Sequence, residues 1–184
     1  ILKIVAGQIQ LALNNAKHVQ QLKKERDNTQ KYLDISDVMI LVLNNRGEVE
    51  LINKKGCEIL GFGQDDIIGK NWFDNFLPPE LKSEVKNVFN KVLKGQLQTT
   101  EYYENHVLTK SGNKRLVAWH NTRLIKEGNK AVGTLSSGVD ITDLRLAEKR
   151  FRDVVESSPN GLIMVNDKGK IMLVNRQVEK LFGY

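Results

Sequence analysis

The residues of this sequence that could do chemistry are few and widely spaced. Three histidines, His18, His106 and His120, and one cysteine, Cys57, could in principle ligate a metal ion or act in nucleophilic catalysis. His106 and His120 fall on different expected strands, and no second ligand type is spaced to complete a metal site with either. The local signatures of Ser/His/Asp and Cys/His catalysis are also missing. We therefore expect this chain to be no enzyme and to hold no metal.

Charge and composition argue against nucleic-acid and membrane partners. The 184 residues carry a net charge of +6, but basic and acidic residues are interspersed even in the densest basic cluster, Lys23-Lys24-Glu25-Arg26. That mixture is typical of a solvated helix. Lys3, Gln8 and Gln10 interrupt the apolar start of the chain, which makes it too polar to span a membrane. We expect no nucleic-acid partner and no membrane contact for this segment.

The single cysteine and one glycine-containing run bear on the cellular compartment and on nucleotide binding. A single cysteine excludes an internal disulfide and is compatible with reducing conditions, so we expect a cytoplasmic location. The run Gly61-Phe62-Gly63 lacks the strand-to-helix phosphate loop that would follow in a nucleotide site. It is therefore weak evidence for nucleotide binding.

Two long helices should flank the part of the chain that could form a binding site. In residues 1–33, apolar side chains recur at alternating spacings of three and four, which predicts a helix of coiled-coil type; they are Leu2, Val5, Ile9, Ala12, Ala16 and Val19. At 1.5 Å per residue the helix would extend roughly 50 Å, too long for a small core. The same spacing returns in residues 144–158 at Leu144, Ala147, Phe151, Val154 and Ser158. We expect both helices to pair with another helix.

A hairpin should follow the first helix. Residues 38–52 contain two β-rich runs around Asn44-Asn45-Arg46-Gly47, a sequence that tolerates the positive φ angles of a tight turn. Asn53 is placed to cap a short helix that Gly61 would end. The aromatic cluster at residues 72–77 should then precede a longer helix that closes at Gly95.

Three strands should complete the domain. Thr100–Thr109, Arg115–Ile125 and Lys130–Ile141 read as strands, with turns at Lys110-Ser111-Gly112-Asn113 and at Glu127-Gly128-Asn129. This order of elements predicts an α+β fold. Its core would be a five-stranded antiparallel sheet with short helices on one face, flanked by long N-terminal and C-terminal helices.

The hairpin is repeated near the end of the chain. Residues 40–62 align without a gap to residues 162–184, and five of the 23 pairs are identical, among them Asn44 with Asn166 and Asn53 with Asn175. Such a repeat indicates a tandem array of modules. Because the second copy stops soon after its first short helix, we interpret residues 159–184 as the truncated start of a second domain.

Residues 34–143 resemble a PAS domain, a sensory module of bacterial and archaeal signalling proteins. The resemblance lies in the opening hairpin and in Asn53, Leu60-Gly61-Phe62, Ile67-Ile68-Gly69-Lys70, Lys110-Ser111-Gly112, Trp119 and Asp140-Ile141-Thr142. Residues 151–184 resemble the start of a second PAS domain that is entered at Ser158-Pro159-Asn160-Gly161. The resemblance divides the chain into a signalling helix (1–33), a PAS domain (34–143), a linker helix (144–158) and the truncated second domain (159–184).

The first helix carries a weaker resemblance. Residues 4–9 (IVAGQI) and 13–17 (LNNAK) are similar to the last helix of GAF domains, which would imply another sensor module upstream. The alternative is a generic signalling coiled coil.

The PAS resemblance implies a site between the inner face of the sheet and the helices. We predict that one of the two alternating sets in residues 115–125 faces this site, together with Val42, Trp72, Phe76, Val88 and Val92. The alternative is a fully collapsed core. The resemblance also implies that Asp140, Ile141 and Thr142 pass strain from the sheet to the following helix.

Departures from the family's cofactor motifs exclude two kinds of cofactor. Gly69-Lys70-Asn71 is followed by Trp72, where flavin-binding members that sense light have a cysteine, so we do not expect a covalent flavin adduct. Residues 79–94 contain no histidine, so we do not expect a histidine-ligated haem either. The cofactor, if the chain has one, stays unknown.

The function that these observations predict is that of a non-catalytic sensory and dimerisation module. It would form a homodimer through its flanking helices, bind a small molecule and act on adjacent sensor and output domains of the same protein. By resemblance the output domain, outside this chain, would be a two-component histidine kinase or a cyclic-dinucleotide enzyme. The alternative is a structural protein–protein interaction module without a small-molecule ligand.

Overall fold

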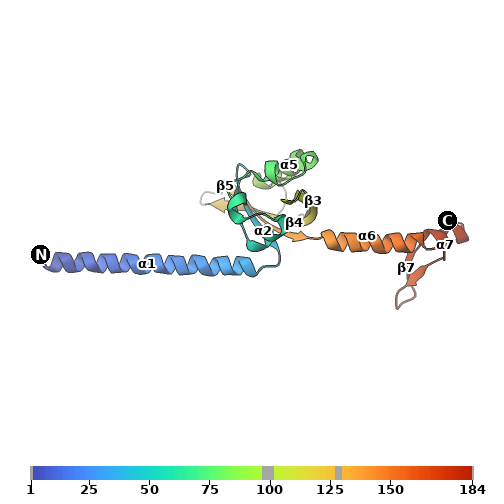
Figure 1. Ribbon diagram of the computed structural model, residues 1–184, viewed down its shortest axis with the longest axis horizontal. Coiled ribbons are helices and arrows are strands. Elements are labelled where there is room, and N and C mark those ends of the chain that lie inside the picture. The colour runs from blue at the N-terminus through green and yellow to red at the C-terminus, as the bar shows by residue number, and fades with distance from the viewer. Residues whose placement is uncertain (1, 97–101, 127–129, 184) are drawn as a thin grey trace. The chain divides into compact units, whose positions relative to one another are not determined.

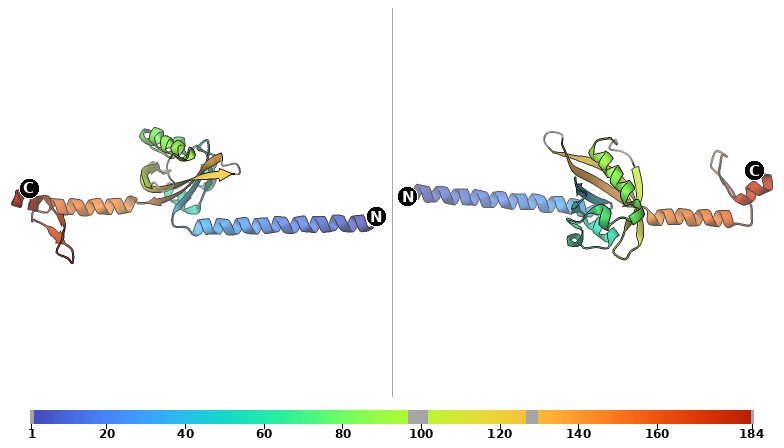
Figure 2. Two further views of the ribbon diagram at one scale, coloured as in Figure 1. Left: turned by 180° about the vertical axis from the view of Figure 1, so that it is seen from behind. Right: turned by 90° about the horizontal axis from the view of Figure 1, so that it is seen from above.

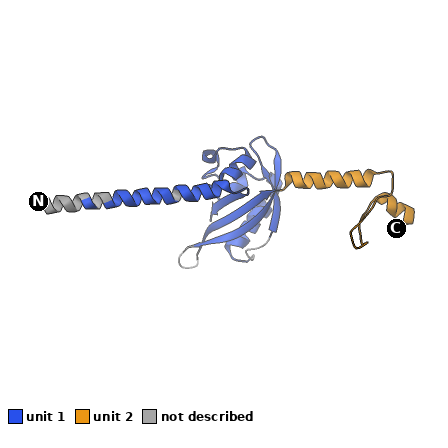
Figure 3. Cartoon of the chain, turned by 90° about the horizontal axis from the view of Figure 1, so that it is seen from below, with its two compact units in different colours: residues 1–140 blue, residues 141–184 orange. Residues whose placement is uncertain are grey.

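The chain divides into two units, residues 1–140 and 141–184 (Figure 3). The structure, a computed structural model, describes residues 2–96, 102–126 and 130–183. No helix in this described part carries a stretch long and apolar enough to cross a bilayer.

Unit 1 contains one long helix and an antiparallel sheet (Figure 1). The strand order in the sheet is β2-β1-β5-β4-β3. The strands are β1 (Met39–Asn44), β2 (Val49–Ile52), β3 (Tyr102–Leu108), β4 (Lys114–Lys126) and β5 (Lys130–Asp140). The helices are α1 (Leu2–Ile35), α2 (Lys54–Leu60), α3 (Gln64–Ile67), α4 (Trp72–Asn75), the 3₁₀ turn η1 (Pro79–Leu81) and α5 (Lys82–Leu93).

The predicted α+β fold with a five-stranded antiparallel sheet is confirmed, and the long helix expected in residues 1–33 is α1. The turn expected at Glu127-Gly128-Asn129 and the strand start expected at Thr100 lie outside the described residues.

Alternation along the strands decides which side chains form the core. On β1, Met39, Leu41 and Leu43 are at most 4% exposed, whereas Ile40 and Val42 are only half-buried on the opposite face. Helices α2 to α5 cover the face to which the buried set belongs (Figure 2). The sheet therefore has one covered face, which is where a binding site can form.

Unit 2 contains a helix and a two-stranded hairpin that ends in a short helix. Its elements are α6 (Thr142–Ser157), β6 (Ile163–Val165), β7 (Ile171–Val174) and α7 (Arg176–Phe182). Ile163 and Val165 are 51% and 56% exposed, whereas their equivalents in the first copy, Leu41 and Leu43, are 2% and 4% exposed. Unit 2 thus repeats the local structure of the first hairpin without the layer that buries it in unit 1.

The flanking helices carry exposed apolar residues. On α1, Val19 and Leu22 are 66% and 56% exposed, and on α6 Leu144, Phe151 and Val154 are between 57% and 69% exposed. The side chains of Leu2, Val5, Ile9 and Ala12 lie outside those described. Apolar side chains at such spacing and exposure are typical of a helix that pairs.

Candidate functional site

A cavity of about 40 Å³ lies between the inner face of the sheet and helices α4 and α5. Its helix side is apolar and consists of Trp72, Phe73, Val85, Val88, Phe89 and Val92. Its sheet side combines Leu41, Leu43 and Trp119 with the polar residues Tyr103, Asn105, Asn121, Thr134 and Ser136. The core is therefore not filled completely at this point.

Three of the five predicted site residues, Trp72, Val88 and Val92, line this cavity. Val42 does not, because alternate residues of a strand face opposite sides and the structure turns Leu41 and Leu43 inward. Phe76 is a core residue outside the lining, and its ring packs on Trp72 with the ring centres 5.2 Å apart. Whether the lining residues bind a ligand stays a prediction.

Aromatic rings define two sides of the cavity. Trp72 and Trp119 meet edge to face with their ring centres 5.9 Å apart, and Phe73 meets Phe89 at 5.2 Å. Such contacts fix ring orientations beyond what burial alone achieves. Because these are the only two tryptophans in the sequence, tryptophan signals report on the cavity directly.

Sequence reasoning covered Asn121 only as a member of one of the two alternating sets in residues 115–125, and it missed the other polar residues of the sheet side, Tyr103, Asn105, Thr134 and Ser136. Ser136 on β5 donates a hydrogen bond from its Oγ to Oδ1 of Asn121 on β4, at 2.6 Å, and Asn105 Nδ2 donates to the carbonyl of His106 at 2.9 Å. The signal was their period of two: Asn121 follows Trp119, and Thr134 and Ser136 alternate on β5. In the sequence alone, polar residues with that period look like the solvent face of a strand.

Tyr103 connects the edge of the cavity to α5. Its hydroxyl donates a hydrogen bond to Oε1 of Glu84, at 2.9 Å. Burial and then the hydrogen bond and charge of Glu84 raise the pKa of Tyr103 to about 12. Tyr103 is therefore neutral at physiological pH and acts as a hydrogen-bond donor that holds α5 against β3.

The histidines and the cysteine lie away from the cavity. His18 is exposed on α1, and His106 and His120 are exposed on β3 and β4. Within the described residues, no group of three or more His, Cys, Asp and Glu side chains is placed to hold a metal ion. Cys57 packs beside the core on α2, where burial raises the pKa of its thiol and disfavours the reactive thiolate.

Asn53 ties the end of α1 to the hairpin and to α2. Its side chain is fully buried, and its Oδ1 accepts hydrogen bonds from the backbone N–H groups of Ile40 (2.9 Å) and Gly56 (3.1 Å). Its Nδ2 donates to the carbonyl oxygens of Leu33 and Val38, both at 2.9 Å. One side chain thus joins the last turns of the entering helix to the sheet, in addition to capping α2 as the sequence predicted.

Asn175 makes the same set of bonds in unit 2. Its Oδ1 accepts from the N–H groups of Leu162 (2.9 Å) and Val178 (3.3 Å), and its Nδ2 donates to the carbonyl oxygens of Val155 (3.0 Å) and Asn160 (2.9 Å). Each of these partners lies 122 residues after its counterpart around Asn53. The helix–hairpin tie is therefore a repeated feature of the chain.

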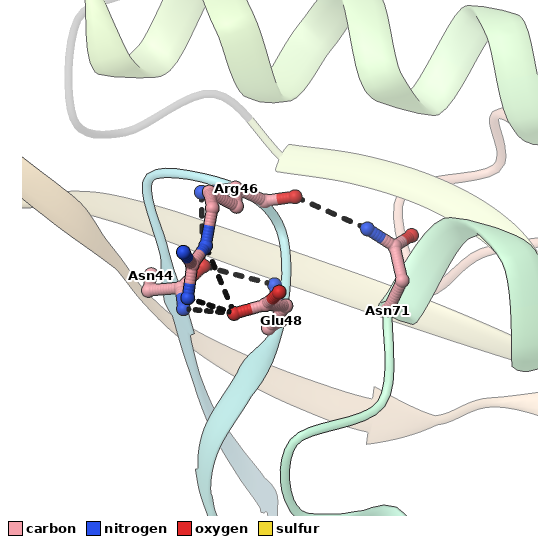
Figure 4. Close-up of polar contacts among 4 residues, drawn as sticks. All are labelled: Asn44, Arg46, Glu48 and Asn71. Carbon is pink, nitrogen blue, oxygen red and sulfur yellow. Dashed lines mark hydrogen bonds and ion pairs between the residues drawn. The ribbon is translucent and has the colours of Figure 1, made fainter.

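The β1–β2 turn is joined to the start of α4 (Figure 4). Asn44 Oδ1 accepts from the N–H groups of Arg46 (2.9 Å) and Glu48 (3.0 Å), and Arg46 pairs with the Glu48 carboxylate at 2.7 Å. Hydrogen bonds from Asn44 and then Arg46 lower the pKa of that carboxyl. Asn71, which caps α4, donates from Nδ2 to the Arg46 carbonyl at 3.1 Å. The turn thereby helps to position Trp72 at the cavity.

The predicted relay residues lie where strand β5 passes into α6. Asp140 is the last residue of β5, and its Oδ2 lies 3.7 Å from Nη1 of Arg115 on β4. Ile141 is buried, and Thr142 is the first residue of α6. Their role in relaying a signal stays a prediction.

Family models match most of the chain. The model for the PAS fold matches residues 33–146, and a PAS domain model matches residues 149–184. No curated protein matches the sequence.

Solved structures share the fold at low sequence identity. A PAS domain of a protein from Colwellia psychrerythraea is 20% identical with a TM-score of 0.57, and the match covers 66% of this chain and 98% of that one. The PAS domain of an HTR-like protein from Haloarcula marismortui is 19% identical with a TM-score of 0.52, covering 68% and 99%. A sensory box histidine kinase/response regulator from Burkholderia thailandensis is 16% identical with a TM-score of 0.52, covering 68% and 93%.

Proposed function

The chain belongs to the PAS family, and on that basis we propose that it is a non-catalytic sensory module that relays a change in its sheet to the helices on either side. The site for the change is the cavity, whose wall is shared by α4, α5 and the four strands β1, β3, β4 and β5. The output domain on which the relay acts lies outside this chain.

The tie made by Asn53 carries this proposal. A buried carboxamide that bonds α1, β1 and α2 at the same time cannot stay in place if the sheet moves relative to the entering helix. A relay needs a differential free energy of a few kcal/mol between two arrangements, and buried hydrogen bonds of this kind supply energies of that size. The helix therefore senses the arrangement of the sheet.

Helix α6, which follows the sheet, is also tied to neighbouring elements at both of its ends. It begins directly after β5, which contributes Thr134 and Ser136 to the cavity, and Asn175 holds its last turn through Val155. In this proposal a displacement of β5 reaches α6 through Asp140, Ile141 and Thr142. Asn175 then transmits it to the hairpin of unit 2.

A cavity-filling substitution tests the relay. Ser136→Val places an extra methyl group in the cavity and removes the bond to Asn121, so amide hydrogen exchange in the last turn of α1 and in α6 should change about fivefold or more, the lower end of typical coupling between sites. The measurement is exchange by mass spectrometry on the full chain. Ser137→Val is the matched control, because it makes the same change on the opposite face of β5.

The control also separates the two classes of function. If Ser137→Val alters the helices and Ser136→Val does not, the outer face of the sheet is the working surface. The chain would then be a structural interaction module without a small-molecule ligand. If neither variant changes exchange outside the sheet, the relay proposal is wrong.

We propose further that the module works as a homodimer whose flanking helices pair. Phe151 and Val154 lie on the exposed apolar stripe of α6, and charge there should oppose pairing. Phe151→Glu should weaken dimerisation about tenfold or more in sedimentation equilibrium, which corresponds to about 1.4 kcal/mol. Lys149→Glu, on the opposite side of the helix, should leave the dimer intact. A strictly monomeric wild-type chain, or equal effects of the two variants, would contradict pairing through this stripe.

Three finer proposals concern the protein around this chain. The exposed apolar hairpin of unit 2 and the family match at residues 149–184 support a second PAS domain that begins there. The family's habit supports a histidine kinase or a cyclic-dinucleotide enzyme as output, with adjacent sensor domains in the same protein. The GAF origin of α1 rests on its sequence alone.

A further inference from the structure

We propose that the cavity takes a small uncharged ligand that carries both a hydrogen-bond acceptor and a donor, as a primary amide does. The inference rests on the proposed function, since it names the ligand class of the same site. It is drawn from the polar residues of the sheet side and from the absence of charge among the lining residues.

Polar side chains occupy the inner face of the sheet where apolar ones would fill the space. Asn105, Thr134 and Ser136 are 5%, 2% and 4% exposed, and they come from strands β3 and β5. Asn121 on β4 lies opposite Ser136 in the sheet. Buried polar groups lose their hydration, so an inner face of this kind is unfavourable unless the groups find hydrogen-bond partners.

The bonds within the chain do not use all of these groups. Asn121 accepts from Ser136 through Oδ1, and Asn105 donates through Nδ2. Within the described part of the chain, Asn121 Nδ2, Asn105 Oδ1 and Thr134 Oγ1 make no hydrogen bond, and all three residues line the cavity. No fully buried side-chain nitrogen or oxygen atom in that part lacks a partner, so these three atoms are open to the cavity and not sealed in the core. The cavity therefore offers an amide donor, an amide acceptor and a hydroxyl that can do either.

The lining carries no formal charge. Its residues are aliphatic, aromatic, amide or hydroxyl side chains. The Tyr103 hydroxyl, like any tyrosine hydroxyl, is neutral at physiological pH, and burial and Glu84 raise its pKa further. A carboxylate or ammonium ligand would lose its hydration in this cavity without meeting an opposite charge. This favours neutral ligands over ions of the same shape.

The volume limits the ligand to a few heavy atoms. A water molecule needs about 10–15 Å³ of cavity volume. The cavity of about 40 Å³ therefore holds roughly three waters or a compound of similar size. The apolar part of that compound would contact Val88, Val92 and Phe89 on the helix side, opposite the polar groups of the sheet. A primary amide with a short alkyl group has this arrangement.

Propionamide and propionate test the class, because they have the same shape and differ in charge. The readout is the two indole N–H resonances of Trp72 and Trp119 in NMR spectra of the full chain. Propionamide should shift them saturably, with a dissociation constant on the order of millimolar for so few atoms. Propionate should bind at least about tenfold more weakly.

Two substitutions locate the contacts. Asn121→Leu removes the amide donor and should weaken propionamide binding about tenfold. Thr134→Val keeps the side-chain shape and should weaken propionamide binding severalfold. This second variant still tests the proposal if Asn121→Leu fails to fold. Thr122→Val, the same change at an exposed position on the neighbouring strand β4, should have no effect.

Equal binding of propionate, no saturable indole shift with propionamide, or equal effects of Thr134→Val and Thr122→Val would overturn the proposal. The first two outcomes would mean that waters alone satisfy the polar groups or that the ligand is of another class. The exchange experiment with Ser136→Val and Ser137→Val uses no ligand. If the exchange experiment gives the expected result and propionamide does not bind, the proposed ligand class is wrong and the relay proposal stands.

Discussion

Replacing Asn53 with alanine should lower the free energy of unfolding of unit 1 by about 3–5 kcal/mol. The substitution leaves two N–H groups, of Ile40 and Gly56, and two carbonyl groups, of Leu33 and Val38, without their partner. The site is fully buried, so water does not replace these bonds without a local rearrangement. Each unsatisfied buried group costs about 1–3 kcal/mol, and partial relaxation brings the sum down to the stated range.

Denaturant unfolding followed by tryptophan fluorescence measures this loss, because both tryptophans lie in unit 1. Asn175→Ala is the matched control. It removes the same set of hydrogen bonds in unit 2 and should leave the tryptophan transition unchanged. Asn53→Asp should lose at least as much stability as Asn53→Ala, because it places a carboxylate oxygen against the carbonyl oxygens of Leu33 and Val38 in a fully buried site. A loss below about 1 kcal/mol for Asn53→Ala would show that the tie contributes no more than an ordinary helix cap.

The same tie shows which part of this structure could be predicted from sequence. Asparagine just before a helical segment predicts a cap, and the bond from Gly56 N–H to Asn53 Oδ1, three residues apart, confirms it. The bonds to Leu33 and Val38 span 20 and 15 residues. No local pattern specifies them, because they depend on how α1 meets the sheet.

Some of the cavity residues could likewise be predicted from the sequence and others could not. Trp72, Val88 and Val92 were predicted from an aromatic cluster and a helical stripe, both of which are strong periodic signals. The choice of Val42 failed because the run Leu41-Val42-Leu43 is apolar on both faces of β1. A continuous apolar run predicts a strand but not the side on which it is covered.

The polar residues of the sheet could not be assigned for a different physical reason. In a half-exposed strand, alternating polar residues normally face water, and Thr134 and Ser136 follow that pattern while facing inward. Inward-facing polar groups are favourable only where they find hydrogen-bond partners, either in the chain or in the molecules that occupy the cavity. The inward direction of these polar residues therefore depends on the site and not on the strand pattern. For this reason the fold could be predicted from the sequence more readily than the polar side of the cavity.

Replacing Gly47 with alanine should destabilise unit 1 by about 2–4 kcal/mol, and for two separable reasons. Gly47 has φ +79°, a left-handed conformation that costs a side-chain-bearing residue about 1 kcal/mol or more. A Cβ atom there would also lie 2.3 Å from Cε2 of Phe73. Phe73 is 2% exposed and packs on Phe89, so its ring cannot turn away without opening the core beside the cavity.

Gly112→Ala separates the two costs, because Gly112 also has φ +79° and no heavy atom lies within 4 Å of its Cβ position. It should lose only about 1 kcal/mol in the same fluorescence-monitored unfolding experiment. The excess loss of Gly47→Ala then measures the contact with Phe73. Because the Gly47 carbonyl accepts a hydrogen bond from the Trp72 N–H at 2.8 Å, that variant should also shift the tryptophan emission of the folded state. Equal losses for the two variants would mean that the contact with Phe73 adds nothing to stability, and that the turn holds α4 only through its hydrogen bonds with Asn71 and Trp72.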